Sequence, residues 1–205
     1  MSRYTGPKLR KMRALGIDLP GLSRKSSERR PYRPGEQGTR GHRRRMSSFG
    51  TQLIEKQKLR FNYGVTERQL RILITAASKK KGDTRELLAA SLESRLDNVV
   101  FRAGLAPTIP AARQLVNHGH VTRNGRKTDI ASCRIEVGDV IQVKEKSRKL
   151  GIVNEVFVDN WDHRPDWLEV DMENHSARMT EVPASGSIPF AVDLLQVVEY
   201  YSSRI

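Results

Sequence analysis

Apolar residues recur at helical spacing through the first half of the chain. One predicted helix begins near Thr51 and ends at Gly64, and its expected inner face is Leu53, Ile54, Gln57 and Phe61. The next begins with Thr-Glu-Arg-Gln at residues 66–69, a capping box in which the threonine oxygen accepts from the third amide while the glutamine reaches back. The apolar positions of this second helix are Leu70, Leu73, Ile74 and Ala77.

Two more helices are predicted before the pattern changes. Asp-Thr-Arg-Glu at residues 83–86 is another cap signature, and one continuous helix is expected from there to Gly104. Its apolar stripe is Leu87, Leu88, Leu92, Leu96, Val99 and Val100. A shorter helix is capped by Thr108, has Pro110 in its first turn and ends at Gly119. Its inward residues are Ala111, Ala112, Leu115 and Val116.

After Gly119 the period shortens to that of β-strands. Residues 120–123 and 126–128 flank Asn124-Gly125, which predicts a hairpin with a type I′ turn because both central residues tolerate positive φ. Further short strands are expected at 135–137, 140–143 and 167–170. Helical spacing returns near the C-terminus at Leu194, Val197, Val198 and Tyr201.

Residues 1–48 are predicted to be irregular, because glycine and proline interrupt every incipient pattern. Basic side chains crowd toward the end of this segment, at Arg40, Arg43, Arg44 and Arg45. We therefore expect an extended basic arm that is mobile in the free protein and becomes ordered when RNA phosphates neutralise it.

Charge points to the class of partner. The chain has 37 Lys and Arg against 23 Asp and Glu, a net charge of +14 and a pI of about 10.3. That pI exceeds the value of about 9 that is typical of nucleic-acid-binding domains. Residues 1–60 hold 17 basic and 4 acidic side chains, whereas residues 161–205 hold 3 and 8. This polarity predicts a basic end that meets a polyanion.

Several other classes of protein and site lack support in the sequence. No apolar run approaches the roughly 18–20 residues of a membrane span, and the N-terminus lacks the apolar stretch of a secretory signal. Gly6-Pro7 argues against a transit-peptide helix, and the single Cys133 fits a reducing compartment. The chain has five His and no Cys pair, so we expect no metal and no other cofactor.

Asp97 is the candidate for acid–base catalysis. The triplet Arg95-Leu96-Asp97 matches the catalytic motif of pseudouridine synthases, but its flanking residues do not follow that motif. We interpret Asp97 as the ion-pair partner of an arginine such as Arg95 or Arg102. The sequence also has no phosphate-binding glycine loop and no nucleophile elbow, so no catalytic residue and no small-molecule substrate is predicted.

The strongest chemistry in the sequence suits RNA. Polar residues of the helix after Thr108 alternate with buried ones, so that guanidinium, amide and imidazole groups share one face and can meet phosphates, riboses and base edges. These residues are Arg113, Gln114, Asn117 and His118. A second group clusters at the hairpin turn and consists of Arg123, Asn124, Arg126 and Lys127.

Residues 91–143 resemble the small RNA-binding module named after small-subunit ribosomal protein four, from SLESRLDNVV to GDVIQV. Blocks on either side resemble the bacterial-type family of that ribosomal protein. They are SRYTGPK (2–8), RRPYRPGEQG (29–38), LIEKQKLRFNYGVTERQL (53–70) and VVEYYS (197–202). Some members of the family hold zinc with four N-terminal cysteines, and this chain has none there.

The resemblance implies an α+β fold. A helical N-terminal domain would carry an inserted module of two helices plus a small antiparallel sheet, and a C-terminal helix would return to the helical domain. The implied parts are a basic extended arm at 1–48, the helical domain at 49–90 plus about 190–205, and the module with a strand-rich extension at 91–189.

The resemblance also implies a function, that of a non-enzymatic structural constituent of the small ribosomal subunit. The family binds small-subunit rRNA at a helix junction in the 5′ domain, nucleates assembly of the body and supports translational accuracy. It contacts ribosomal protein five of the small subunit and lies near the messenger RNA entry side. The location implied is the ribosome of the cytoplasm, or of a plastid.

The rRNA-facing positions carried over from the family include residues in the arm, the helical domain and the module. They are Arg3, Lys8, Arg43, Arg44, Arg45, Lys56, Lys58, Arg60, Arg95, Asn98, Arg113, Gln114, His118, Arg123, Asn124 and Arg126. Two alternatives use the same module: an RNA-modifying enzyme, for which Asp97 would be essential, and an RNA chaperone that is substoichiometric with ribosomal subunits.

Overall fold

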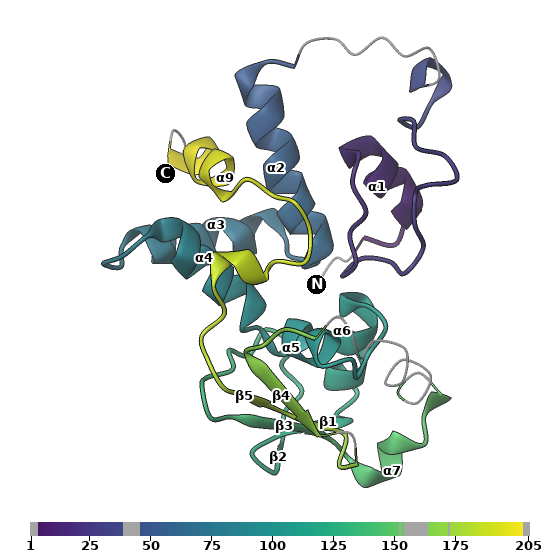
Figure 1. The fold of residues 1–205 in the computed structure, drawn as a ribbon, viewed down its shortest axis with the longest axis vertical. Coiled ribbons are helices and arrows are strands. Elements are labelled where there is room, and N and C mark those ends of the chain that lie inside the picture. The colour runs from purple at the N-terminus through teal and green to yellow at the C-terminus, as the bar shows by residue number, and fades with distance from the viewer. Residues whose placement is uncertain (1–3, 39–45, 152, 154–163, 172, 203–205) are drawn as a thin grey trace. The chain divides into compact units, whose positions relative to one another are not determined.

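The computed structural model describes residues 4–38, 46–151, 153, 164–171 and 173–202 (Figure 1). The chain divides into two compact units. The helical unit consists of Met1–Leu88 and Ile188–Ile205, and the sheet unit consists of Ala89–Ser187. The mixed α+β class predicted from the sequence is confirmed.

The helical unit brings the C-terminal helix back to the first half of the chain. Its elements are α1 (Lys8–Leu15), the 3₁₀ turn η1 (Glu36–Gly38), α2 (Ser48–Asn62), α3 (Glu67–Ser78) and α9 (Leu194–Ser202), and α4 (Thr84–Glu93) runs from this unit into the next. Helix α9 packs against α2 and α3. The predicted C-terminal helix is therefore confirmed.

An ion pair between buried Lys56 and half-exposed Glu67 lies where α9 meets the helices before it. Lys56 of α2 is only 4% exposed, and its Nζ lies 2.9 Å from the Glu67 carboxylate at the start of α3. The Tyr201 hydroxyl donates to the other oxygen of Glu67 at 2.6 Å. The ring of Tyr200 lies against Lys56, with its centroid 4.5 Å from Nζ. One carboxylate thus links three helices.

Local signals placed the helix starts more accurately than the inner faces. The capping box at Thr66 and Gln69 is present in both directions, as predicted. Helix α2 begins at Ser48, with the Ser47 side chain as its cap, and not near Thr51. The fully buried positions of α2 are Lys56, Leu59 and Asn62. The predicted inner residues Leu53, Ile54, Gln57 and Phe61 are only half-buried, because the fully buried stripe runs along Lys56, Leu59 and Asn62 instead.

The continuous helix expected up to Gly104 is wrong. Helix α4 ends at Glu93, Arg95 is extended with ψ 139, and α5 begins at Leu96. At this break Arg95 forms a β-bridge with Arg134. The amides of Leu96 and Asp97 then donate to the carbonyls of Cys133 and Ala131. A distant segment of the chain therefore replaces the helical hydrogen bonds that the break removes.

The sheet unit packs two helices against an antiparallel sheet. Its helices are α5 (Leu96–Arg102), α6 (Ile109–Asn117) and the short α7 (Glu145–Arg148), and the 3₁₀ turn η3 is Ser185–Ser187. Its strands are β1 (Val121–Arg123), β2 (Arg126–Lys127), β3 (Val140–Val143), β4 (Leu168–Asp171) and β5 (Ser176–Met179), in the spatial order β2-β1-β3-β5-β4. Every pairing is antiparallel.

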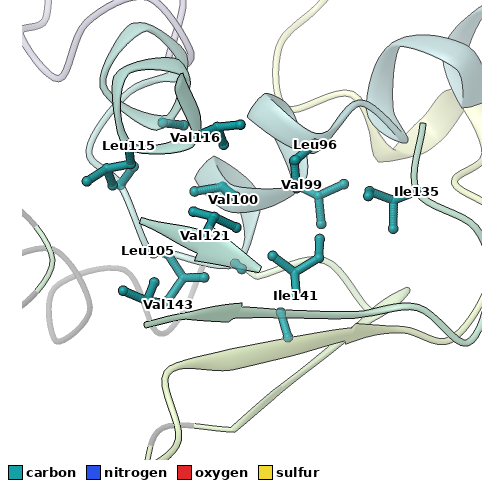
Figure 2. Close-up of a cluster of buried hydrophobic side chains, with 14 of the residues drawn as sticks. Leu96, Val99, Val100, Leu105, Leu115, Val116, Val121, Ile135, Ile141 and Val143 are labelled. Carbon is teal, nitrogen blue, oxygen red and sulfur yellow. The ribbon is translucent and has the colours of Figure 1, made fainter. Parts of the chain in front are cut away.

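One apolar cluster holds this unit together (Figure 2). Leu96, Val99 and Val100 of α5 face Leu115 and Val116 of α6, and Figure 2 shows strand residues closing the cluster from the other side. The strand residues are Val121, Ile141 and Val143, each no more than 1% exposed. The core fixes α6 on one face of the sheet.

The hairpin is confirmed and one predicted strand is not. Asn124 and Gly125 both have positive φ, 50° and 77°, as a type I′ turn requires. Residues 135–137 form no strand, because the Ile135 amide donates to Ser94 at the helix break and the Glu136 amide to the Asp139 carboxylate. Strands β3 and β4 lie where 140–143 and 167–170 were predicted, within one residue.

The expectation of an irregular, extended arm is wrong for residues 8–15, which form α1. Gly16 ends this helix in the left-handed conformation, with φ 72. Met12, Leu19 and Leu22 form a small buried cluster, against which Phe61 of α2 and Phe190 pack. These apolar anchors provide enough contact to fold the segment onto α2 despite its glycines and prolines.

Candidate nucleic-acid interface

Helix α6 and the β1–β2 hairpin share one polar surface. Thr108 caps α6, and Ala112, Leu115 and Val116 bury one side of the helix. The opposite side exposes Gln114, Asn117 and His118. Exposed Arg126 and Lys127 of β2 belong to the same unit. Amide, imidazole, guanidinium and ammonium groups therefore stand in reach of an RNA backbone.

Gly119 brings the two elements together. It follows α6 with φ +73, and a Cβ built there would lie 2.5 Å from Cε of Lys127. The stem of Lys127 therefore occupies the space that a side chain at residue 119 would need. As a result, the ammonium group of the hairpin lies beside the end of α6, next to His118. The sequence predicted that Gly119 ends the helix but not this contact.

Asp97 is fully buried between two arginines. Its carboxylate accepts from Arg95 Nε and Nη2 at 3.0 and 2.9 Å. It also accepts from Arg113 of α6, at 3.1 Å from Nε and 2.6 Å from Nη2. The predicted pairing with Arg95 is confirmed. Because Asp97 is fully buried and its carboxylate is held by two guanidinium groups, it has no open side for a substrate and is unsuited to acid–base chemistry.

Glu93 organises the other polar residues at the α4–α5 break. Asn98 is 1% exposed and donates to the Glu93 carboxylate at 2.8 Å and to the Glu93 carbonyl at 2.9 Å. Arg102 places Nε 3.5 Å from the same carboxylate and donates to the Ser187 carbonyl at 2.7 Å. Asn98 and Arg95 were predicted to face rRNA, and the structure instead places both in the interior.

Asp139 holds the base of the hairpin. Its carboxylate accepts from Asn124 Nδ2 at 2.7 Å, from the Glu136 amide at 2.8 Å and from the Arg123 guanidinium. Burial alone would raise the pKa of Asp139, but the hydrogen bonds from Arg123, Glu136 and Asn124 outweigh it and hold the pKa below its ordinary value. The predicted contacts Arg123 and Asn124 are therefore tied into the hairpin, with Asn124 still exposed.

The predicted contacts of the helical unit divide in the same way. Lys56 is buried against Glu67. Lys58 pairs with Glu55 at 2.6 Å and donates to the Ala191 carbonyl. Lys8 and Arg60 are half-exposed on α1 and α2. Four predicted contacts lie outside the described residues: Arg3, Arg43, Arg44 and Arg45.

Exposed cations occur elsewhere in the helical unit. Lys79, Lys80 and Lys81 follow α3, and the sequence predicts for them either an RNA contact or a complement to the helix dipole. Sequence reasoning missed a second group, which follows α1: Arg24, Lys25, Arg29 and Arg30. The local density of Lys and Arg was the available signal, and it does not depend on resemblance to a family.

Two other kinds of site are absent from the described part of the chain. No helix there is long and apolar enough to cross a bilayer. No three side chains among His, Cys, Asp and Glu there are grouped so as to hold a metal ion.

The sequence matches two family models, the ribosomal protein S4/S9 N-terminal domain over residues 3–93 and the S4 domain over residues 94–141. The chain is 55% identical to small ribosomal subunit protein uS4 of Methylobacillus flagellatus. It is 53% identical to uS4B of Nitrosomonas europaea and 50% identical to uS4 of Nostoc punctiforme. Each match covers 100% of both chains.

These relatives carry the names of ribosomal proteins, and none carries the name of an enzyme. The predicted resemblance is confirmed, as is the prediction that the chain is not an enzyme. Since the two models together span residues 3–141 and the relatives match from end to end, the chain belongs to the small ribosomal subunit protein uS4 family.

Proposed function

We propose that this chain is a structural constituent of the small ribosomal subunit that binds small-subunit rRNA directly. The observation that carries the proposal is the sorting of charge in the sheet unit. Asp97 and Glu93 are fully buried and paired, whereas His118, Arg126 and Lys127 are exposed on one surface. Burying acids and displaying cations leaves a surface suited to phosphates.

The finer roles follow from family membership. We propose that the chain binds a helix junction in the 5′ domain of the rRNA, nucleates assembly of the subunit body and supports translational accuracy. Its proposed neighbours are ribosomal protein five of the small subunit and messenger RNA near the entry side. Its proposed location is the ribosome of the cytoplasm, or of a plastid.

The exposed members of the carried-over set remain proposed rRNA contacts. They are Lys8, Arg60, Gln114, His118, Asn124 and Arg126, to which we add Asn117 and Lys127. Arg95 and Asn98 are proposed to support the contacts of the sheet unit from within, and Lys56 those of the helical unit. Arg113 and Arg123 belong to both groups, since each is partly exposed and paired with an aspartate.

Co-sedimentation tests the proposal. Tagged chain should remain with small ribosomal subunits at one copy per particle after a moderate salt wash. A substoichiometric amount would instead favour a free RNA chaperone, and loss of all chain from the particles would remove the structural role.

A pair of matched variants tests the surface. Arg126→Gln with Lys127→Gln should weaken binding to a 5′-domain transcript and lower the slope of log affinity against log salt by about 0.7–0.9 for each phosphate that the variant no longer neutralises. Arg178→Gln removes an exposed cation of β5, which β1 and β3 separate from β2, and should change the slope less. An equal effect for each charge removed would show charge alone to matter, without a localised surface.

A further inference from the structure

A single carboxylate closes the loop that follows α1. Asp18 accepts from the Ser26 hydroxyl at 2.6 Å, from the Ser27 hydroxyl and from the Ser27 amide at 3.0 Å. Burial alone would raise the pKa of Asp18, but these hydrogen bonds outweigh it and hold the pKa below its ordinary value. The carboxylate is therefore ionised at neutral pH, in the form that accepts all of these bonds.

Other contacts fix the same loop to the helical unit. Leu19 and Leu22 are 0% and 4% exposed. The Gly21 amide donates to Asn62 Oδ1 of α2 at 2.9 Å. Farther along, Arg13 of α1 donates through Nε to the Tyr32 carbonyl at 3.0 Å, and its guanidinium lies 4.8 Å from the centre of the Tyr32 ring. Contacts within the helical unit thus hold both ends of residues 18–32.

What this held loop displays is positive charge. Residues 24–30 carry four exposed cations, Arg24, Lys25, Arg29 and Arg30, and one acid, Glu28. None of these cations was among the contacts expected from the family resemblance. Four of the seven residues in this loop are therefore cations that solvent can reach.

We propose that Asp18 is a positioning residue that preforms residues 24–30 as a cationic loop for the phosphate backbone of rRNA. The inference rests on the proposed function. A loop that must be ordered during binding loses conformational entropy at that step, so a loop already closed by Asp18 binds more tightly.

The proposal is testable because Asp18 has two physical effects that change RNA affinity in opposite directions. By charge alone, an anion among four cations weakens RNA binding, so Asp18→Ala would strengthen it. By preorganisation, Asp18→Ala opens the loop. If the open loop is competent only a tenth to a third of the time, the affinity falls about three- to tenfold.

The experiment measures filter binding of the full chain to a 5′-domain transcript of small-subunit rRNA. Glu28→Gln is the matched control, because it removes one negative charge from the same loop without touching the Asp18 hydrogen bonds. We expect Glu28→Gln to bind slightly more tightly and Asp18→Ala to bind about three- to tenfold more weakly. Asp18→Ala that behaves like Glu28→Gln would overturn the proposal.

A second variant keeps the carboxylate and removes its donors. Ser26→Ala with Ser27→Ala leaves the net charge unchanged, so it should weaken binding in the same direction as Asp18→Ala. An unchanged affinity would overturn the proposal. Limited trypsin digestion provides a readout that does not involve RNA: cleavage after Lys25 and Arg29 should be faster in both variants than in the wild type. Equal cleavage in all three chains would also overturn the proposal.

Failure of the two proposals can be told apart. If the wild-type chain does not bind the transcript, the proposed function fails. If it binds, but replacing Arg24, Lys25, Arg29 and Arg30 by Gln leaves the salt slope unchanged, the loop makes no phosphate contact and only the further inference fails. Near-UV circular dichroism of each variant confirms that the helical unit is folded.

Discussion

At the residue scale, acidic side chains organise the basic ones. Asp97, Glu93 and Asp139 each accept from more than one donor, in agreement with the rule that buried charges are paired and hydrogen-bonded. An arginine bound in this way is held in place, and the acid balances part of its charge. The exposed lysines and arginines therefore determine the electrostatic potential of the surface. Arginine therefore has two roles in this protein: paired with a buried acid it supports the surface, and exposed to solvent it forms the surface.

Removing Asp97 should strongly destabilise the sheet unit. In Asp97→Ala, Arg95 stays buried at 7% exposure without its anion, and breaking a buried pair in this way costs about 3–5 kcal/mol. Urea unfolding followed by circular dichroism measures the loss. Asp129→Ala, which removes an exposed aspartate from the same unit, should change stability little. Comparable losses in the two variants would contradict the assigned role of Asp97.

The stability of the helical unit should depend on Glu67 in acid. Burial alone would raise the pKa of Glu67, but hydrogen bonds from Tyr201 and Lys56 outweigh it, so the pKa of the folded state lies below the ordinary 4.5. Because the folded-state pKa is depressed, this stabilisation is present above the ordinary value and is lost as pH falls through the folded-state pKa.

Thermal unfolding between neutral pH and pH values below 4.5 measures this effect. Glu67→Gln should be less stable than the wild type at neutral pH, and the difference should shrink in acid, where the wild-type carboxylate is protonated. Glu28→Gln, at an exposed site, should follow the wild-type curve. If the difference in stability between Glu67→Gln and the wild type were the same at every pH, ionisation of the Glu67 carboxylate would not be the cause.

At the scale of elements, close approaches of backbone decide how helices and strands meet. The helix is interrupted between α4 and α5 because residues 131–135 supply backbone hydrogen-bond partners there. The hairpin reaches the end of α6 because Gly119 leaves room for Lys127. Both joints bring segments that are distant in sequence to the same surface.

Gly119→Ala should affect both stability and RNA binding. A non-glycine residue at φ +73 costs about 1–2 kcal/mol, and the new methyl group must displace the stem of Lys127. Gly125→Ala is a matched control, with φ +77 and nothing within 4 Å of its Cβ position. Chemical unfolding should show similar losses for both, whereas filter binding to the transcript should show a larger loss for Gly119→Ala. Equal RNA affinities for the two variants would show that the packing of Lys127 on Gly119 does not contribute to RNA binding.

At the scale of the whole molecule, both units expose cations, and the buried acids of the sheet unit are paired. The helical unit displays residues 24–30 and 79–81, and the sheet unit displays the end of α6 with the hairpin. Each unit by itself is thus suited to a phosphate backbone. The acidic residues of the last part of the chain do not cancel these surfaces, because Glu169, Asp171 and Glu173 lie on and after β4, at the opposite edge of the sheet from β2.

The salt dependence of rRNA binding tests this view of the whole chain. If about six to ten phosphates are neutralised, affinity should fall roughly 10³–10⁵-fold between 50 and 200 mM salt, by analogy with duplex DNA. Filter binding across that range provides the slope. A slope near zero would mean that the exposed cations do not meet phosphates.

The sequence by itself determined the features that depend on neighbouring residues. The Thr66 capping box, the type I′ turn at Asn124-Gly125 and helix α6 are all present where local patterns predicted them. Their physics is local, because each rests on hydrogen bonds or backbone angles within a few residues. The excess of basic residues and the family resemblance were likewise evident from composition and motifs alone.

Only the tertiary structure decided which polar residues face outward. Arg95, Asn98 and Lys56 looked like surface cations and amides in the sequence, yet each is buried against an acid. The Arg95–Asp97 pair was predicted because the two residues are neighbours in the sequence. The acids that bind Asn98 and Lys56 lie on a different helix from each of them, and periodicity carries no information about such pairing. A buried charge is stable only when it is paired with an opposite charge. A basic side chain can therefore be buried only where the fold places a carboxylate beside it, and otherwise it stays exposed.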